Sequence, residues 1–149
     1  MAMISKRTSI FETNSSSTHS ISIVDYKNSQ EDKPNLVQNN ILYPNLLYNY
    51  ELHYGETTVL SCINTPMKLS LLIHWLFEYC DNAEISDDIY HEVITKLKEK
   101  GNYDDIVFES SDYYYFDDDN RIFDKYNIEE LIDFCFNDNI QFIYSINPY

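Results

Sequence analysis

The chain has 149 residues, which is long enough for a domain with a sizeable hydrophobic core, and we expect residues 1–149 to form a single domain. Its formal net charge is −15, and residues 76–149 carry 19 Asp and Glu against five Lys and Arg. A surface of that sign repels nucleic acid and attracts basic proteins, so we expect no direct binding of DNA or RNA.

The first third of the chain predicts a hairpin followed by irregular segments. Residues 7–13 and 18–25 indicate two strands, which we expect to pair around the serine-rich turn between them. Residues 26–40 are polar and rich in turn formers, so they predict a loop or insertion. Residues 41–56 predict irregular structure with a short strand or helical turn, because Pro44 blocks a regular helix at the start of this segment.

A strand and a long helix are expected next. The β-branched stretch 57–63 is typical of a strand. Thr65 as N-cap and Pro66 at the first helical position predict a helix that runs to about Cys80. Apolar residues recur along this helix at intervals of three and four, so we expect one face to be buried: Leu69, Leu72, Ile73, Leu76, Phe77 and Cys80. We expect His74, near that face, to be a hydrogen-bonded core histidine.

The next segment predicts a second helix, a strand and an acidic hairpin. Ser86 is expected to cap a helix over 87–100, with Gly101 as its C-terminal stop. Residues 104–109 predict a strand, and the Tyr- and Asp-rich residues 110–120 predict a hairpin-like region with an acidic tip.

A third helix and a final strand complete the predicted elements. Asn127 is expected to cap the helix, which Asn139 ends, and residues 140–146 predict the strand. The order of these elements predicts an α+β fold, in which about three helices pack on a small, largely antiparallel sheet.

One polar cluster near the start of the chain is a candidate ligand site. Its members are Arg7, Glu12, Asn14, Ser15, Ser16, Ser17, Thr18 and His19. Hydroxyls and turn N–H groups could bind a phosphate beside an arginine, and a histidine with a carboxylate could do acid–base work or bind a metal. The same residue types also form hydrogen-bonded turns that lock a hairpin into place. No glycine elbow supports a serine nucleophile, so we assign no catalytic residue.

Metal and cofactor sites are not expected elsewhere. The three cysteines are widely spaced, and no Cys/His pattern typical of zinc occurs, so we expect reduced thiols, no metal and no cofactor. No apolar run approaches the ~20 residues that cross a bilayer, and no signal-peptide core follows the basic start. We therefore expect no membrane partner and a cytoplasmic location.

The segment 9–21 resembles the opening of an uncharacterised protein family of bacteriophages and Gram-positive genomes, whose members carry the motif FETNSSSTHS after a basic start. Two shorter stretches, 68–73 and 130–137, are also similar to family features. The resemblance implies a phage or mobile-element context. Longer members carry an Asp-His pair before the last helix, whereas residues 109–115 here contain no histidine, so a centre that depends on that histidine is absent.

The second candidate site is an acidic face with interleaved tyrosines. Its members are Asp104, Asp105, Glu109, Asp112, Tyr113, Tyr114, Tyr115, Asp117, Asp118, Asp119, Asp124 and Tyr126. The spacing of a calcium-binding loop is missing from it. A solvated hairpin tip is one interpretation of such a charge run. The other is a surface that mimics the phosphates of nucleic acid and uses tyrosine rings as anchors on a basic partner.

These features lead to three functional hypotheses. The first is a non-enzymatic, acidic phage or mobile-element protein that inhibits a basic, nucleic-acid-handling host protein or ribonucleoprotein complex, for example an anti-CRISPR inhibitor that mimics nucleic acid. The second is a nucleotide- or phosphate-binding enzyme that uses the polar cluster from Arg7 to His19. The third is a structural or assembly protein of a virion. The sequence gives no indication of the oligomeric state.

Overall fold

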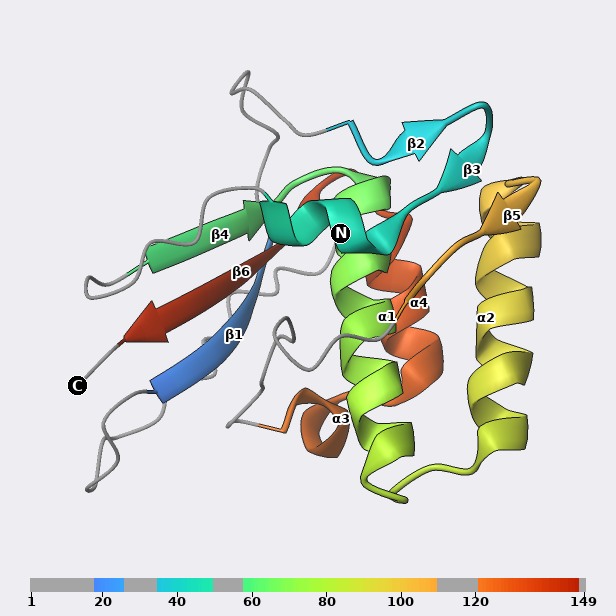
Figure 1. Ribbon diagram of the computed structural model, residues 1–149. Helices are drawn as coiled ribbons and strands as arrows, with labels where there is room; N and C mark the ends of the chain where they lie inside the picture. Colours follow the sequence, from blue (N-terminus) through green and yellow to red (C-terminus); the bar gives the residue numbers. More distant parts are fainter. Residues whose placement is uncertain (1–17, 26–34, 50–57, 110–120, 148–149) are drawn as a thin grey trace.

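The computed structural model of the protein describes residues 18–25, 35–49, 58–109 and 121–147 (Figure 1). Four α-helices, one 3-10 helix and two small sheets lie in these residues, and together they confirm the expected α+β class. The strand expected at 7–13 and the acidic hairpin expected at 110–120 lie outside the described residues.

The larger sheet is antiparallel and has β6 (Ile140–Asn147) as its central strand, between β1 (Thr18–Asp25) and β4 (Thr58–Cys62). The strands predicted at these three places are therefore confirmed. Phe142 and Tyr144, two residues apart on β6, are both buried, as the period of two in a strand requires. Figure 1 shows the long helices gathered to one side of this sheet.

The smaller sheet begins with a tight hairpin. Its first strand and its turn fall in the predicted loop 26–40, whereas its second strand and the 3-10 helix at Pro44–Asn49 fit the short strand or helical turn predicted in 41–56. β2 (Val37–Gln38) pairs antiparallel with β3 (Ile41–Leu42), which pairs in parallel with β5 (Asp105–Ile106). Asn39 and Asn40 form the turn with φ of 53° and 60°, a left-handed conformation that asparagine tolerates and that two-residue hairpins need. The predicted strand at 104–109 is shorter than expected, because only its second and third residues pair.

Helix α1 (Thr65–Asp81) lies at the centre of the fold. The side chain of Asn64 caps it by accepting a hydrogen bond from the backbone N–H of Met67 at 2.9 Å, so the cap lies one residue before the predicted Thr65. Every residue from Met67 to Leu76 is buried, and the expectation of a single buried face is wrong. The reason is that α1 is contacted from different sides by the larger sheet, the 3-10 helix η1 (Pro44–Asn49), α2 (Asp87–Gly101) and α4 (Ile128–Cys135).

Helix α2 (Asp87–Gly101) packs on α1 and exposes its outer face. Ser86 caps it as predicted, since its hydroxyl accepts from the N–H of Ile89. The prediction that Gly101 ends the helix is wrong, because Gly101 is itself the last helical residue. Asn102 takes the left-handed C-cap conformation, with φ of 57°. Gly101 is needed for another reason, because a Cβ there would collide with the ring of Tyr103.

Two helices follow the undescribed residues 110–120. The short α3 (Ile122–Lys125) was not expected from the sequence. α4 (Ile128–Cys135) starts with a capping box, in which Asn127 and Glu130 each bind the backbone N–H of the other. The predicted cap is therefore confirmed, but the helix ends four residues before Asn139.

Candidate functional site

The first sequence-predicted site falls mostly outside the described residues. Arg7, Glu12, Asn14, Ser15, Ser16 and Ser17 all precede β1. Thr18 and His19 are the first two residues of β1, where their backbones lie opposite Asn147 and Ile146 of β6. The hypothesis of a ligand site in this cluster stays a prediction.

The acidic face is described only in part, and its described members do not lie together. Asp112, Tyr113, Tyr114, Tyr115, Asp117, Asp118 and Asp119 are outside the described residues. Asp104, Asp105 and Glu109 are exposed in or beside β5, whereas Asp124 is exposed on α3; Figure 1 shows β5 and α3 near opposite ends of α1. Tyr126 belongs to the core instead, since it is only 7% exposed and its ring meets that of Phe134 edge-on at 5.3 Å. Its ring is therefore no exposed anchor.

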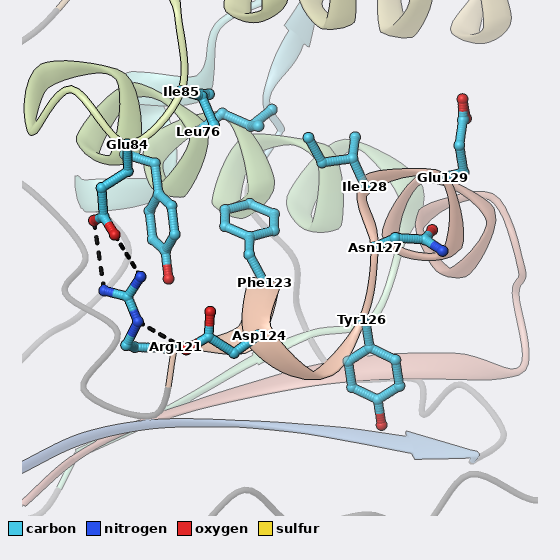
Figure 2. A pocket seen from close by; sticks show the side chains of 11 residues that line it. Leu76, Glu84, Ile85, Arg121, Phe123, Asp124, Tyr126, Asn127, Ile128 and Glu129 are labelled. Atoms are coloured by element: carbon cyan, nitrogen blue, oxygen red, sulfur yellow. Dashed lines mark hydrogen bonds and ion pairs between the residues drawn. The ribbon is translucent and has the colours of Figure 1, made fainter.

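The structure instead reveals a groove of about 430 Å³, which we call the α1–α3 groove. It lies where the end of α1 and the turn that follows meet α3 and the start of α4 (Figure 2). Its lining consists of Leu76, Tyr79, Glu84, Ile85, Arg121, Phe123, Asp124, Tyr126, Asn127, Ile128 and Glu129. These residues come from two segments about 40 positions apart in the sequence, which is why no local pattern indicated the site.

The floor of the α1–α3 groove is apolar and aromatic. Leu76 and Tyr79 come from the last turns of α1 and are buried. The ring of Phe123 meets that of Tyr79 edge-on, with 4.6 Å between centroids. Ile85 and Ile128 are partly buried and pack against the core from opposite sides of the groove. Apolar surface left partly open in a concave site is typical of a binding surface.

The rim of the groove carries one arginine and three carboxylates. Arg121 donates from Nε to Asp124 Oδ2 at 2.8 Å and pairs through its terminal nitrogens with the carboxylate of Glu84 (Figure 2). Its guanidinium also lies 5.2 Å from the centroid of the Tyr79 ring. Glu129, the third carboxylate, pairs with Lys96 of α2.

These contacts fix the charge of the rim. The hydrogen bonds to Glu84 and then to Asp124 raise the pKa of Arg121, so the guanidinium remains charged at every physiological pH. Arg121 has a left-handed backbone, with φ of 54°, at the position before α3. Because Arg121 serves two carboxylates at once, the lining residues have a net negative charge.

A second cluster, around Lys68, is buried and was missed because a lone lysine in a helix usually faces solvent. Lys68 is 0% exposed, and its Nζ donates to the carbonyl oxygens of Phe134, Asn137 and Ile140 at 2.9, 2.7 and 2.7 Å. All three of its donors therefore have an acceptor, although burial lowers its pKa. This arrangement fits a structural tie between α1, the end of α4 and the start of β6.

The thiols near this lysine are not activated. Cys62 and Cys135 are fully buried free thiols, and burial raises the pKa of each well above its ordinary value, against the smaller opposing effect of Lys68. All three cysteines are unpaired with one another, as the sequence analysis expected. His74 is a core histidine, as expected, with Nε2 at 3.2 Å from the carbonyl oxygen of Pro44.

The described residues include no group of three or more His, Cys, Asp or Glu side chains arranged to hold a metal ion. No helix in the described part of the chain combines the length and apolar character that crossing a bilayer requires. Comparisons with protein-family models, curated proteins and solved structures give no significant match to this chain.

Proposed function

We propose that this protein is a non-enzymatic, acidic interaction protein that binds and inhibits a basic, nucleic-acid-handling protein. The observation that supports the proposal best is the number of carboxylates exposed on the described surface. Carboxylates are exposed on the outer sides of α2 and α4, including Glu92, Glu99, Glu130 and Asp133. Such a surface attracts a basic partner and speeds its association.

Of the six Lys and Arg in the described residues, four do little to offset these carboxylates, and Lys98 and Lys125 are the other two. Lys96 and Lys100 of α2 pair with Glu129 and Asp133 of α4, and Arg121 is held on the groove rim. Lys68 is buried. Exposed ion pairs of this kind contribute little to stability, ~0–1 kcal/mol each, but they leave few cations to face a partner. The surface that remains is therefore dominated by negative charge.

The concrete form of this proposal is a counter-defence inhibitor of phage or mobile-element origin, such as an anti-CRISPR protein. The resemblance of the segment 9–21 to a phage family supports the context, and the net charge of −15 supports mimicry of nucleic acid. The partner is then a ribonucleoprotein complex whose basic groove normally holds DNA or RNA, and the inhibitor competes for that groove.

Binding to purified ribonucleoprotein nucleases, CRISPR effector complexes among them, tests the proposal. We expect the protein to bind at least one complex and to inhibit its cleavage of target DNA. Because the attraction is between exposed charges, the affinity should fall steeply between ~50 and ~200 mM salt. Binding to none of the complexes, or an affinity that does not change with salt, would contradict the proposal.

A further inference from the structure

We infer that the α1–α3 groove binds a short segment of the partner in which an apolar or aromatic side chain lies next to Lys or Arg. This inference rests on the proposed function, because it says which surface recognises the basic partner and by what chemistry. The floor of the groove supplies the apolar contact, and its rim supplies the negative charge.

The floor has room for one apolar side chain. Phe123, Ile85 and Ile128 are each partly exposed at the groove, while Leu76 and Tyr79 behind them are buried. The volume of about 430 Å³ exceeds what one aromatic side chain needs and leaves room for part of the backbone beside it. A single buried aromatic or aliphatic anchor is the usual centre of such an interface.

The rim selects the charge of the segment. Three carboxylates of the lining face two cations, Arg121 and the Lys96 that pairs with Glu129, so the rim keeps a net charge of −1, which attracts a cation and repels an anionic peptide or phosphate. The two oxygens of Glu84 and one of Asp124 already hold Arg121. An arginine of the partner would bind the same carboxylates, because its planar fork matches them in the same way.

This geometry gives Arg121 an unusual role. It neutralises part of the rim from within the chain and therefore competes with the cation of the partner. Removing its charge should strengthen binding, whereas removal of a residue that only stabilises the fold would weaken binding or leave it unchanged. The sign of the Arg121 effect thus separates the two roles.

A fluorescence-polarisation assay with labelled synthetic peptides tests the inference. The probe is a short peptide with one Trp flanked by Arg and Lys, and two matched peptides replace either the Trp by Gly or the basic residues by Glu. We expect the probe to bind, and each matched peptide to bind at least ~10-fold more weakly. Equal binding of all three, or preference for the acidic peptide, would overturn the inference.

Four variants locate the binding site, with circular dichroism to verify that each is folded. Glu84→Gln, which changes the rim, and Ile128→Thr, which changes the floor, should each weaken binding of the probe peptide by ~5-fold or more. Arg121→Asn removes the charge and places at this position a residue that tolerates the left-handed backbone. It should strengthen binding of the probe peptide by ~3-fold or more at low salt. Asp138→Asn removes an exposed carboxylate outside the groove and should have no effect.

The outcomes for the groove and for the proposed function can be told apart. If the peptide fails to bind while the full protein still binds a basic nuclease complex in a salt-dependent way, the groove inference is overturned and the proposed function stands. If Glu84→Gln weakens binding of the peptide and binding of the nuclease complex to the same degree, the groove inference and the proposed function are both supported. If Glu84→Gln and Asp138→Asn behave alike, the groove is not the binding surface.

Discussion

Lys68 places an ammonium group among three main-chain carbonyls inside an apolar core. The carbonyls of Phe134, Asn137 and Ile140 accept from this group near the end of α4 and the start of β6, and those of Phe134 and Asn137 also accept a backbone N–H, from Asn137 and Ile140 respectively. The lysine therefore satisfies three acceptors with one side chain. It also ties α1 to residues about 70 positions further along the chain.

We expect Lys68→Met to destabilise the protein by ~1–3 kcal/mol. The methionine fills the volume but removes the ammonium donor from all three carbonyl oxygens, of which those of Phe134 and Asn137 keep only a backbone N–H. Lys125→Met, at an exposed lysine of α3, is the control and should change the free energy of unfolding by less than ~0.5 kcal/mol. Urea denaturation measures both, and equal effects would show that Lys68 is not a structural tie.

His74 makes stability depend on pH in a defined window. Burial lowers its pKa from 6.5 to about 4, and the smaller effect of its hydrogen bond to the Pro44 carbonyl opposes this. The unfolded chain takes up a proton below pH 6.5, whereas the folded protein does so only near pH 4. The stabilisation by neutral His74 is therefore complete above pH 6.5 and is lost as the pH falls to 4, by up to ~3 kcal/mol.

His74→Gln should remove this pH dependence, since glutamine does not titrate and can still donate to the Pro44 carbonyl. Denaturation at pH 7 and at pH 4 should show that the variant loses ~3 kcal/mol less than the wild type between the two. The matched control is His91→Gln on the exposed side of α2, which should follow the wild type. If the wild type and both variants lost the same free energy of unfolding between pH 7 and pH 4, the hypothesis of a neutral buried His74 would be refuted.

At the scale of elements, the helices differ in what holds them in place. α1 is buried on all sides and needs no favourable surface charges, whereas α2 packs through few buried residues, Val93 and Leu97 among them. α2 depends more on its ends, where Asp87 and Asp88 lie in the first turn and Lys98 and Lys100 in the last. We therefore expect α2 to be the more sensitive helix to changes at its caps.

Ser86→Ala should destabilise α2 by ~1 kcal/mol, because it removes the acceptor for the N–H of Ile89. Ser86→Asp restores an acceptor and should recover most of the loss. Hydrogen exchange of α2 amides, compared with that of α1 amides, detects the change, and we expect it to be confined to α2. If the α2 amides exchanged at the same rate in the wild type and in Ser86→Ala, the Ser86 cap would contribute nothing to the stability of α2.

Local patterns in the sequence predicted the elements well. The pattern in residues 18–25 predicted β1, Ser86 predicted the start of α2, and Asn127 predicted the start of α4. For the two helices the capping contacts join residues only three positions apart, whereas β1 was predicted without its distant partner β6. The hairpin at Asn39 and Asn40 was missed because its strands are two residues long and the surrounding segment is polar.

Contacts between distant residues could not be predicted in the same way. The full burial of α1 depends on elements from both halves of the chain. The α1–α3 groove joins Glu84 to Arg121, and the burial of Lys68 depends on carbonyls that follow α4. The sequence indicated an acidic protein but could not locate its concave, partly apolar surface.

At the scale of the whole molecule, the acidic charge is distributed over several elements and not over one face. The described carboxylates include exposed ones at the end of α1 and in the turn after it, on α2, α3 and α4, and near β5. A partner can therefore use the α1–α3 groove for specific contacts and the wider surface for attraction over a longer distance. The two contributions respond differently to salt, because screening acts most strongly on exposed charges.

A charge-reversal variant of the predicted acidic tip extends the nuclease-binding experiment. Reversing the charges of Asp117, Asp118 and Asp119 to Lys should weaken binding of the basic partner and flatten the salt dependence, while stability changes little. An unchanged affinity in this triple variant would remove the predicted acidic tip from the interface. It would leave the groove and the outer faces of α2 and α4 as the remaining contact surfaces.

The position of β6 in the larger sheet has a consequence for how the chain folds. β6 contains residues 140–147, yet it is the strand on which both β1 and β4 pair. β1 and its partner are about 120 residues apart, so the sheet closes a very long loop. During synthesis neither outer strand can pair in the native way until β6 has left the ribosome. We therefore expect slow, late and cooperative folding of the sheet.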